Sequence, residues 1–130
     1  MSLIKVLIAD DEPAVLEIMA HKLSSSDFQV ITAKDGLEAW EKIQSQAPDI
    51  VLLDLVMPGL DGFEVLSQLR KNPPSTKWIP VIIISANDEV KNMQRTFELQ
   101  ADHYLTKPCT IKDILKAIRL MISLIPLRNS

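Results

Sequence analysis

Aspartates follow two of the apolar runs in this sequence, where they could bind a cation together. Asp10 and Asp11 come directly after the run at residues 3–9, and Asp54 follows the run at residues 50–53. Three carboxylates brought close together repel one another, and a bound divalent metal removes that conflict. Oxygen-only ligation, completed by waters and a substrate phosphate, favours Mg²⁺ or Mn²⁺ over zinc. The aspartates therefore predict a magnesium site, with Mn²⁺ as the second choice.

A hydroxyl and a lysine follow two further runs, and they suit the transfer of a phosphoryl group. Ser85 comes after the run at residues 81–84, and Lys107 comes after the segment 103–106. A carboxylate beside a divalent ion and a lysine can attack a phosphoryl group, because both cations offset charge on the phosphoryl oxygens. Asp54 is the candidate acceptor, and the predicted product is an acyl phosphate.

Each of these residues has a common structural role when it is considered alone. A pair of aspartates after a strand often caps a helix, and a single Asp can begin a turn. A serine at a strand end often satisfies backbone groups, and a Lys-Pro dipeptide is usually a surface turn. The functional interpretation is favoured because all of these residues follow strand candidates in the same way.

Five short segments predict the strands that would position these side chains. Three of them are nearly continuous apolar runs, which suit parallel strands covered on both faces. The other two are assigned mainly because they fall between helical segments. The expected strands are residues 3–9, 28–32, 50–53, 81–84 and 103–106.

Apolar residues recur at helical spacing between the strands, so each intervening segment predicts a helix that lies on the sheet. Pro13 suits a first helical turn, and Asp35, Asp61 and Asp88 stand where helices could be capped. The last helix, 111–125, is apolar on more than one side, so we expect part of it to contact a partner. The other stripes are Leu16, Met19, Ala20 and Leu23; Trp40, Ile43 and Ala47; Phe63, Leu66 and Leu69; and Val90, Met93 and Phe97.

Strict alternation of strand and helix predicts an open, doubly wound parallel α/β sheet with helices on both faces. In such sheets the ligand site lies beyond the carboxyl ends of the strands. Neighbouring parallel strands are about 4.8 Å apart, so the side chains that follow them could converge in one small pocket.

Composition limits the classes of protein to which this chain can belong. Its 130 residues suit one domain, expected over residues 1–130, with 126–130 as a tail or the start of a linker. An apolar share of 47% with 24% charged residues is typical of a soluble protein. We expect neither a membrane span nor a secretory signal, and therefore a cytoplasmic location. The formal charge of −3 disfavours direct nucleic-acid binding, and the single Cys109 excludes an internal disulfide.

Four blocks of sequence match a known family in order and spacing. The blocks are Val6-Leu7-Ile8-Ala9-Asp10-Asp11-Glu12-Pro13, Leu53-Asp54-Leu55-Val56-Met57-Pro58-Gly59-Leu60-Asp61-Gly62, Ile84-Ser85-Ala86 and Tyr104-Leu105-Thr106-Lys107-Pro108. With these blocks, the chain resembles a response regulator receiver domain of two-component systems, of the chemotaxis-regulator kind, over nearly its whole length. The resemblance implies a flavodoxin-like (βα)5 three-layer sandwich with strand order 2-1-3-4-5 and a site between the first and third strands.

The resemblance also assigns the metal ligands and the reaction. Asp54 would be the phosphoacceptor and a direct Mg²⁺ ligand, together with Asp11 and the backbone carbonyl of Val56. Asp10 would act through metal-bound water. The implied function is phosphorelay signalling, in which a histidine kinase or a phosphotransfer protein passes a phosphoryl group to Asp54. The domain would assist its own phosphotransfer and dephosphorylation, and it would not be an enzyme acting on other substrates.

Three further residues would form the switch that the resemblance implies. Lys107 would pair with the phosphoacceptor and then with the phosphoryl oxygens, and the hydroxyl of Ser85 would move in to bind one of them. Tyr104 would turn inward in response and change the surface formed by the fourth helix, fifth strand and fifth helix. That surface would meet an output domain or a second copy. A half-buried strand aromatic is an equally good interpretation of Tyr104, and the bond before Pro108 is expected to be cis.

The sequence departs from the family pattern at three positions. Gln100 stands where the family usually has glycine before the fifth strand, which costs stability if the turn needs a positive φ. Cys109 replaces a frequent phenylalanine, and Val56 places an apolar side chain two residues after the phosphoacceptor. These two departures put partner docking and the dephosphorylation rate in doubt.

Two other functions are compatible with the predicted fold. A magnesium-dependent phosphohydrolase with an aspartyl-phosphate intermediate would usually carry a second aspartate at the position of Val56. A pseudo-receiver that serves only as an interaction module would be expected to lack an acidic residue or the lysine of the pocket, and neither is missing. The chain could be a complete regulator or a domain cut from a longer protein, with a slight preference for the latter.

Overall fold

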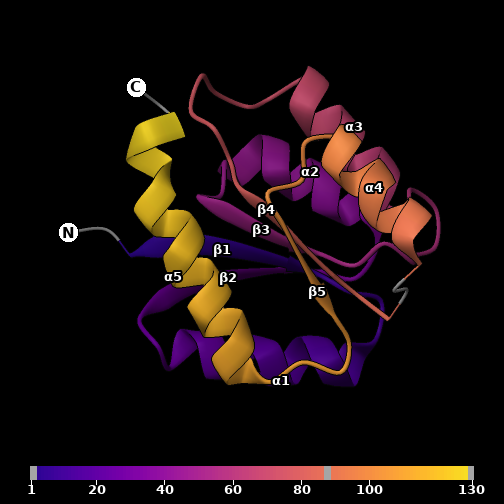
Figure 1. Ribbon diagram of the computed structural model, residues 1–130. Coiled ribbons are helices and arrows are strands. Elements are labelled where there is room, and N and C mark those ends of the chain that lie inside the picture. The colour runs from indigo at the N-terminus through magenta and orange to yellow at the C-terminus, as the bar shows by residue number, and fades with distance from the viewer. Residues whose placement is uncertain (1–2, 87–88, 129–130) are drawn as a thin grey trace.

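Five parallel strands alternate with five helices in the computed structural model, which describes residues 3–86 and 89–128 (Figure 1). This architecture confirms the expected doubly wound α/β fold. The strands are β1 (Ile4–Ala9), β2 (Phe28–Ala33), β3 (Ile50–Leu53), β4 (Val81–Ser85) and β5 (His103–Thr106). The helices are α1 (Pro13–Ser24), α2 (Gly36–Gln46), α3 (Gly62–Lys71), α4 (Val90–Glu98) and α5 (Ile111–Arg128).

The strands form one sheet in the order β2-β1-β3-β4-β5, as expected. Ala9 at the end of β1 pairs with Ala33 on one side and with Leu53 on the other. Ser85 at the end of β4 pairs with Thr106 at the end of β5. Because every pair is parallel, the residues that follow these strands gather at one edge of the sheet.

Alternate residues of each strand build two separate apolar layers. Val6 and Ile8 pack in a cluster with side chains of α1 and α5, whereas Leu7 and Ala9 pack in a cluster with side chains of α2 and α3. Helices therefore cover both faces of the sheet (Figure 1). The central strands β3 and β4 are buried throughout, which explains why they are apolar runs with no alternation.

The strand boundaries differ from the sequence prediction by a residue at most. β1 begins at Ile4 rather than residue 3, and β2 extends to Ala33. β4 includes Ser85, so this serine is the last residue of the strand rather than the first residue after it. β3 and β5 have the expected bounds.

Local capping explains where the helices begin. Pro13 is in the first turn of α1, where its missing N–H costs nothing. The Asp35 side chain accepts the backbone N–H of Glu38 at 2.8 Å, and that of Asp61 accepts the N–H of Glu64 at 2.9 Å. Both expected caps are thus confirmed. Asp88 lies outside the described residues.

The helix α5 begins with a reciprocal capping pair. The backbone N–H of Asp113 donates to Thr110 Oγ1 at 3.1 Å, and the backbone N–H of Thr110 donates to the Asp113 carboxylate at 3.2 Å. These bonds satisfy donors that the first helical turn leaves open. The hydrogen bonds of the Asp113 carboxylate with the backbone and side chain of Thr110 lower the pKa of Asp113.

The predicted inward face of α4 is confirmed only for Met93, which packs against the core. Val90 and Phe97 are 68% and 48% exposed, and Thr96 is fully buried instead. The Thr96 hydroxyl donates to the carbonyl of Met93 at 2.7 Å, so a small polar side chain can face the interior without an open hydrogen bond. Ala47 is also misplaced, because it is the exposed C-cap of α2 with a φ of 43°.

The helix α5 extends to Arg128, three residues beyond the expected end. Ile114, Ile118 and Met121 are buried against the sheet, while Leu120 is 50% exposed on another side. The expectation of more than one apolar side is therefore confirmed for the helix itself. Among the described residues, no helix has the length and apolar character that crossing a bilayer requires.

A polar cluster lies at the edge of the sheet where β4 and β5 begin, opposite the carboxyl ends of the strands. Arg70 of α3 donates to Asp102 at 2.9 Å and to the carbonyl of Gln100 at 3.0 Å, and its guanidinium stacks on Trp78 at 3.8 Å. Asp102 also accepts the backbone N–H of Val81 at 2.9 Å. Gln100 has a φ of 71°, so the turn before β5 does need the left-handed conformation that the sequence put in question.

Candidate functional site

Three aspartates meet at the carboxyl edge of the sheet. Asp10 follows β1, Asp54 follows β3, and Asp11 is next to Asp10 at the start of the β1–α1 connection. One carboxylate oxygen from each lies within 4.8 Å of the others. Asp10 and Asp54 are 3% and 7% exposed, whereas Asp11 faces solvent. The predicted convergence of these three residues is confirmed.

Backbone groups orient the two buried carboxylates. Asp10 Oδ1 accepts the N–H of Glu12 at 2.9 Å, and Asp54 Oδ1 accepts the N–H of Val56 at 3.1 Å. The N–H of Asp54 donates to the carbonyl of Ala9 at 3.0 Å and so continues the ladder between β1 and β3. Both carboxylates are therefore held by the sheet and by the first residues of the loops that follow it.

Lys107 bridges the same two aspartates. Its Nζ donates to Asp10 Oδ2 at 2.8 Å and to Asp54 Oδ2 at 3.0 Å. Burial by itself would lower the pKa of Lys107, but the hydrogen bonds and charges of the two carboxylates outweigh it and raise the pKa. The lysine is therefore a cation at neutral pH. The Lys107–Pro108 peptide is cis, as expected.

Ser85 and Tyr104 lie on the neighbouring strands β4 and β5. Ser85 is 1% exposed, and its carbonyl accepts the N–H of Lys107 at 2.9 Å. Tyr104 is 8% exposed and packs in the apolar cluster shared with α2 and α3. Tyr104 is therefore a buried aromatic here, and not the half-buried one considered above.

The donor set suits a hard divalent cation. All of its side-chain ligand atoms are carboxylate oxygens, and three carboxylates against one lysine leave a negative excess at the edge of the sheet. Oxygen ligands of this kind fit Mg²⁺, Mn²⁺ or Ca²⁺, and they do not fit a thiolate-bound metal. The Val56 side chain is 66% exposed and apolar, so it adds no charge.

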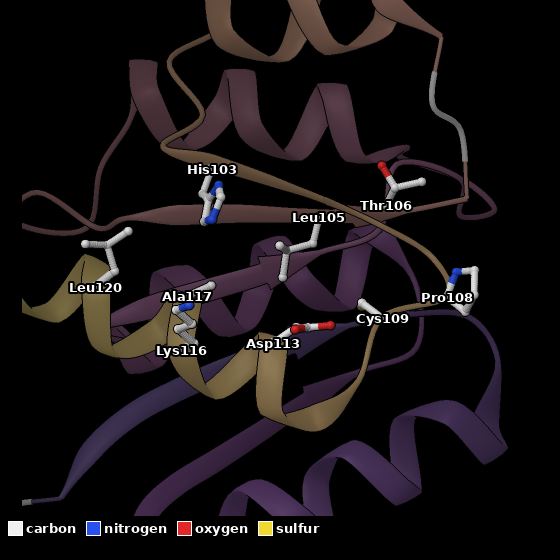
Figure 2. A pocket seen from close by; sticks show the side chains of 9 residues that line it. All are labelled: His103, Leu105, Thr106, Pro108, Cys109, Asp113, Lys116, Ala117 and Leu120. Atoms are coloured by element: carbon white, nitrogen blue, oxygen red, sulfur yellow. The ribbon is translucent and has the colours of Figure 1, made fainter.

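Two hollows flank the loop that carries Lys107. A pocket of about 290 Å³ lies between β5 and α5, lined by Leu105, Cys109 and Ala117 among others (Figure 2). A larger groove of about 730 Å³ runs between α1 and the start of α5. Lys107 lines this groove, which therefore opens next to the acidic cluster. Burial raises the pKa of the Cys109 thiol, the charge of Asp113 adds to the rise, and Lys107 opposes it.

The fold and the site together define a class of α/β phosphoacceptor domains, with an acidic cluster and a lysine at the carboxyl edge of a parallel sheet. Residues 6–119 match the family described as the response regulator receiver domain. The chain belongs to this family.

Curated relatives extend well beyond the region that this chain matches. The alkaline phosphatase synthesis transcriptional regulatory protein PhoP of Bacillus subtilis is 35% identical over 118 residues, which cover 91% of this chain and 48% of PhoP. The response regulator MprA of Mycobacterium ulcerans is 36% identical over 119 residues, which cover 92% of this chain and 50% of MprA. The chain thus spans about half the length of these relatives.

Solved receiver domains have the same fold. A CheY-like receiver domain protein from Methanospirillum hungatei superposes with a TM-score of 0.91 at 25% identity, covering 98% of this chain and 99% of its own. The BeF3-activated N-terminal receiver domain of Klebsiella pneumoniae RstA superposes with a TM-score of 0.81 at 29% identity, covering 89% and 96%. The predicted strand order and family are thereby confirmed.

Proposed function

We propose that Asp54 accepts a phosphoryl group from a phosphohistidine of a histidine kinase or a phosphotransfer protein, and that Mg²⁺ is the metal required. Asp11, Asp54 and the carbonyl of Val56 would hold the metal directly, and Asp10 would hold it through water. One observation carries this proposal: the oxygens of Asp10, Asp11 and Asp54 lie within 4.8 Å of one another, with the Lys107 ammonium against two of them.

Asp54 would act as the nucleophile. One of its carboxylate oxygens forms the new P–O bond as the P–N bond to the donor imidazole breaks, and that imidazole nitrogen leaves with the bonding electrons. The product is an acyl phosphate on Asp54 and a free histidine. The N–H of Val56 and the ammonium of Lys107 each bind one oxygen of this carboxylate, so its direction is set before the donor arrives.

Charge on the transferring group is offset from two sides. Mg²⁺, when bound, supplies Lewis-acid stabilisation of the phosphoryl oxygens. Lys107 supplies the second positive charge, and its raised pKa keeps it protonated at neutral pH. Once the phosphoryl group is bound to Asp54, Lys107 would donate to a phosphoryl oxygen in place of the Asp54 carboxylate oxygen.

Ser85 and Tyr104 would transmit the new state. Ser85 is the last residue of β4, and its carbonyl accepts the backbone N–H of Lys107 at 2.9 Å. Tyr104 follows in the neighbouring strand, where Ser85 pairs with Thr106. If the Ser85 hydroxyl moved toward the phosphoryl group, the Tyr104 side chain would turn inward in response. The surface formed by α4, β5 and α5 would then change. An output domain or a second copy would bind there.

A phosphohydrolase is the weaker alternative. The second aspartate that would serve such an enzyme as acid and base is replaced by Val56, whose side chain is apolar and largely exposed. The chain is therefore a phosphoacceptor and not an enzyme of that kind. We also place it in the cytoplasm, where kinases draw on ATP, and we assign it no direct contact with nucleic acid.

Labelling with acetyl phosphate tests the proposal. The wild-type chain should gain one phosphoryl group in the presence of Mg²⁺, as measured by intact mass, and none after chelation. Asp54→Asn should gain none, because the amide is a far weaker nucleophile. Asp27→Asn is the matched control, since Asp27 is exposed, lies far from the site, and has a φ of 68° that Asn also adopts readily. Labelling of Asp54→Asn equal to the wild type would refute the proposal.

A further inference from the structure

All three glycines of the chain lie in or against the loop that follows Asp54. The chain contains 3 glycines, at positions 36, 59 and 62. Gly59 lies in the loop and has a φ of 73°, which favours glycine because other residues are strained there. Gly36 and Gly62 are instead the first residues of α2 and α3. They need a different explanation, and the space around them supplies it.

Gly62 brings α3 against the phosphoacceptor itself. A Cβ at this position would overlap the carbonyl oxygen of Asp54 and would lie 2.7 Å from the Cα of Leu55. Both are backbone atoms, so no side-chain rotation could relieve the clash. The N–H of Gly62 donates to the carbonyl of Leu55 at 3.0 Å and closes the base of the loop. The loop is thus held at the end where Asp54 lies.

Gly36 brings α2 against the other end of the same loop. A Cβ at this position would overlap the carbonyl oxygen of Leu60 and would lie 2.6 Å from its carbonyl carbon. The contact joins two segments that are distant in sequence, the start of α2 and the end of the loop at residues 55–61. Two helices therefore hold the loop between them, each through a glycine.

The same four-residue pattern begins both helices. Asp35-Gly36-Leu37-Glu38 starts α2, and Asp61-Gly62-Phe63-Glu64 starts α3. In each, the aspartate caps the helix by accepting the N–H of the glutamate, at 2.8 Å and 2.9 Å respectively. The cap satisfies a backbone donor of the first turn, and the glycine lets that turn approach the loop backbone.

We propose that Gly36 is a positioning residue for phosphotransfer, because it lets α2 hold the loop in the position that the Val56 peptide requires. This inference rests on the proposed function. Leu55 and Met57 are 3% and 6% exposed, so their side chains anchor the loop on both sides of Val56. A displaced loop would therefore move the backbone of Val56, whose N–H donates to Asp54 at 3.1 Å and whose carbonyl is the proposed metal ligand.

Gly36→Ala tests the inference, with Asp35→Ala as the matched control. Gly36→Ala destabilises the fold because its Cβ pushes on Leu60, whereas Asp35→Ala only removes the cap of α2. We expect Gly36→Ala to bind Mg²⁺ about tenfold more weakly, measured by calorimetry, which is the low end for loss of a group that orients metal ligands. Its acetyl phosphate labelling rate at saturating Mg²⁺ should fall as well. Asp35→Ala should match the wild type in both, although urea unfolding should show a loss of stability for this variant too.

Three outcomes separate the claims. If the wild type takes no label, the proposed function fails. If the wild type is labelled and folded Gly36→Ala equals it in Mg²⁺ affinity and rate, the positioning role of Gly36 is wrong. If Gly36→Ala does not fold, hydrogen exchange of the wild type decides: the Gly62 amide should exchange only through global unfolding. Rapid exchange of that amide through local opening would show that the loop is not held, and would overturn the inference.

Discussion

Cys109 lies between two hollows, and its surroundings change the pKa of its thiol. It lines the pocket between β5 and α5 (Figure 2) and also the groove beside α1. Burial raises its pKa, and the nearby carboxylate of Asp113 raises it further. Folding therefore favours the neutral thiol, and the contribution of this group to stability is lost as pH rises above the unfolded pKa. At neutral pH the thiol should be a poor nucleophile.

The pH dependence of alkylation tests this assignment. We expect the iodoacetamide rate of the folded chain to rise with a midpoint above about 8.5, the usual pKa of a free cysteine, and that of the urea-unfolded chain to lie near it. Asp113→Asn should shift the folded midpoint downward, because it removes one of the two causes of the rise. A folded midpoint at or below the unfolded one would contradict the assignment.

The helices α1 and α5 create a surface that neither could form alone. The groove between them has a volume of about 730 Å³ and an apolar lining that includes Ile18, Ile111 and Ile114. Lys107 also lines this groove, and its ammonium pairs with Asp10 of the acidic cluster. A protein donor must bring its phosphohistidine to Asp54, whereas acetyl phosphate needs no protein surface. We therefore expect the groove to be part of the docking site of the protein donor.

Ile18→Ser separates docking from chemistry. Ile18 is 57% exposed in α1, and Leu37 is 56% exposed in α2, which makes Leu37→Ser a control of equal chemistry. With a phosphotransfer protein that labels the wild type, Ile18→Ser should slow transfer by about tenfold, because central apolar contacts at interfaces typically contribute more than 1 kcal/mol. Its acetyl phosphate labelling should not change. Equal slowing by Leu37→Ser would argue against a docking role for the groove.

The two edges of the sheet have separate tasks in the whole molecule. The carboxyl edge collects the charged groups that carry the proposed chemistry: three carboxylates that repel one another and one lysine that offsets part of their charge. At the opposite edge Asp102, whose side chain is 1% exposed, is surrounded by donors from Arg70, Trp78 and the backbone of Val81. Those contacts join α3, β4 and β5. Stability and function are therefore supported from opposite edges of one sheet.

Asp102→Ala tests whether stability and the proposed chemistry depend on opposite edges of the sheet. Removing the carboxylate leaves the Arg70 guanidinium, which is only 10% exposed, without its buried partner, and such losses typically cost ~3 kcal/mol or more. Urea unfolding should show that loss. Under conditions where the variant is folded, the Mg²⁺ dependence and rate of acetyl phosphate labelling should equal those of the wild type. A large change in Mg²⁺ affinity with little loss of stability would contradict the division of tasks.

Much of the fold could be predicted from the sequence, because central strands that are buried on both faces are continuous apolar runs in the sequence. β3 was predicted to the residue for this reason. The inward face of α4 was not, because an amphipathic pattern shows that a helix has an apolar side but not which way that side points. Val90 and Phe97 face outward there, and Thr96 packs inward with its hydroxyl satisfied within the helix.

The candidate site divides in the same way. Asp10, Asp54 and Lys107 were identifiable in advance because parallel strands must end at one edge, so side chains that follow the strands converge without further information. No sequence pattern indicated the close contact between Gly36 and the carbonyl of Leu60. The order of the chain specifies which side chains lie at the carboxyl edge of the sheet. Close contacts between distant segments depend instead on the exact position of each helix on the sheet. Packing of the whole core decides that position, so only the tertiary structure shows these contacts.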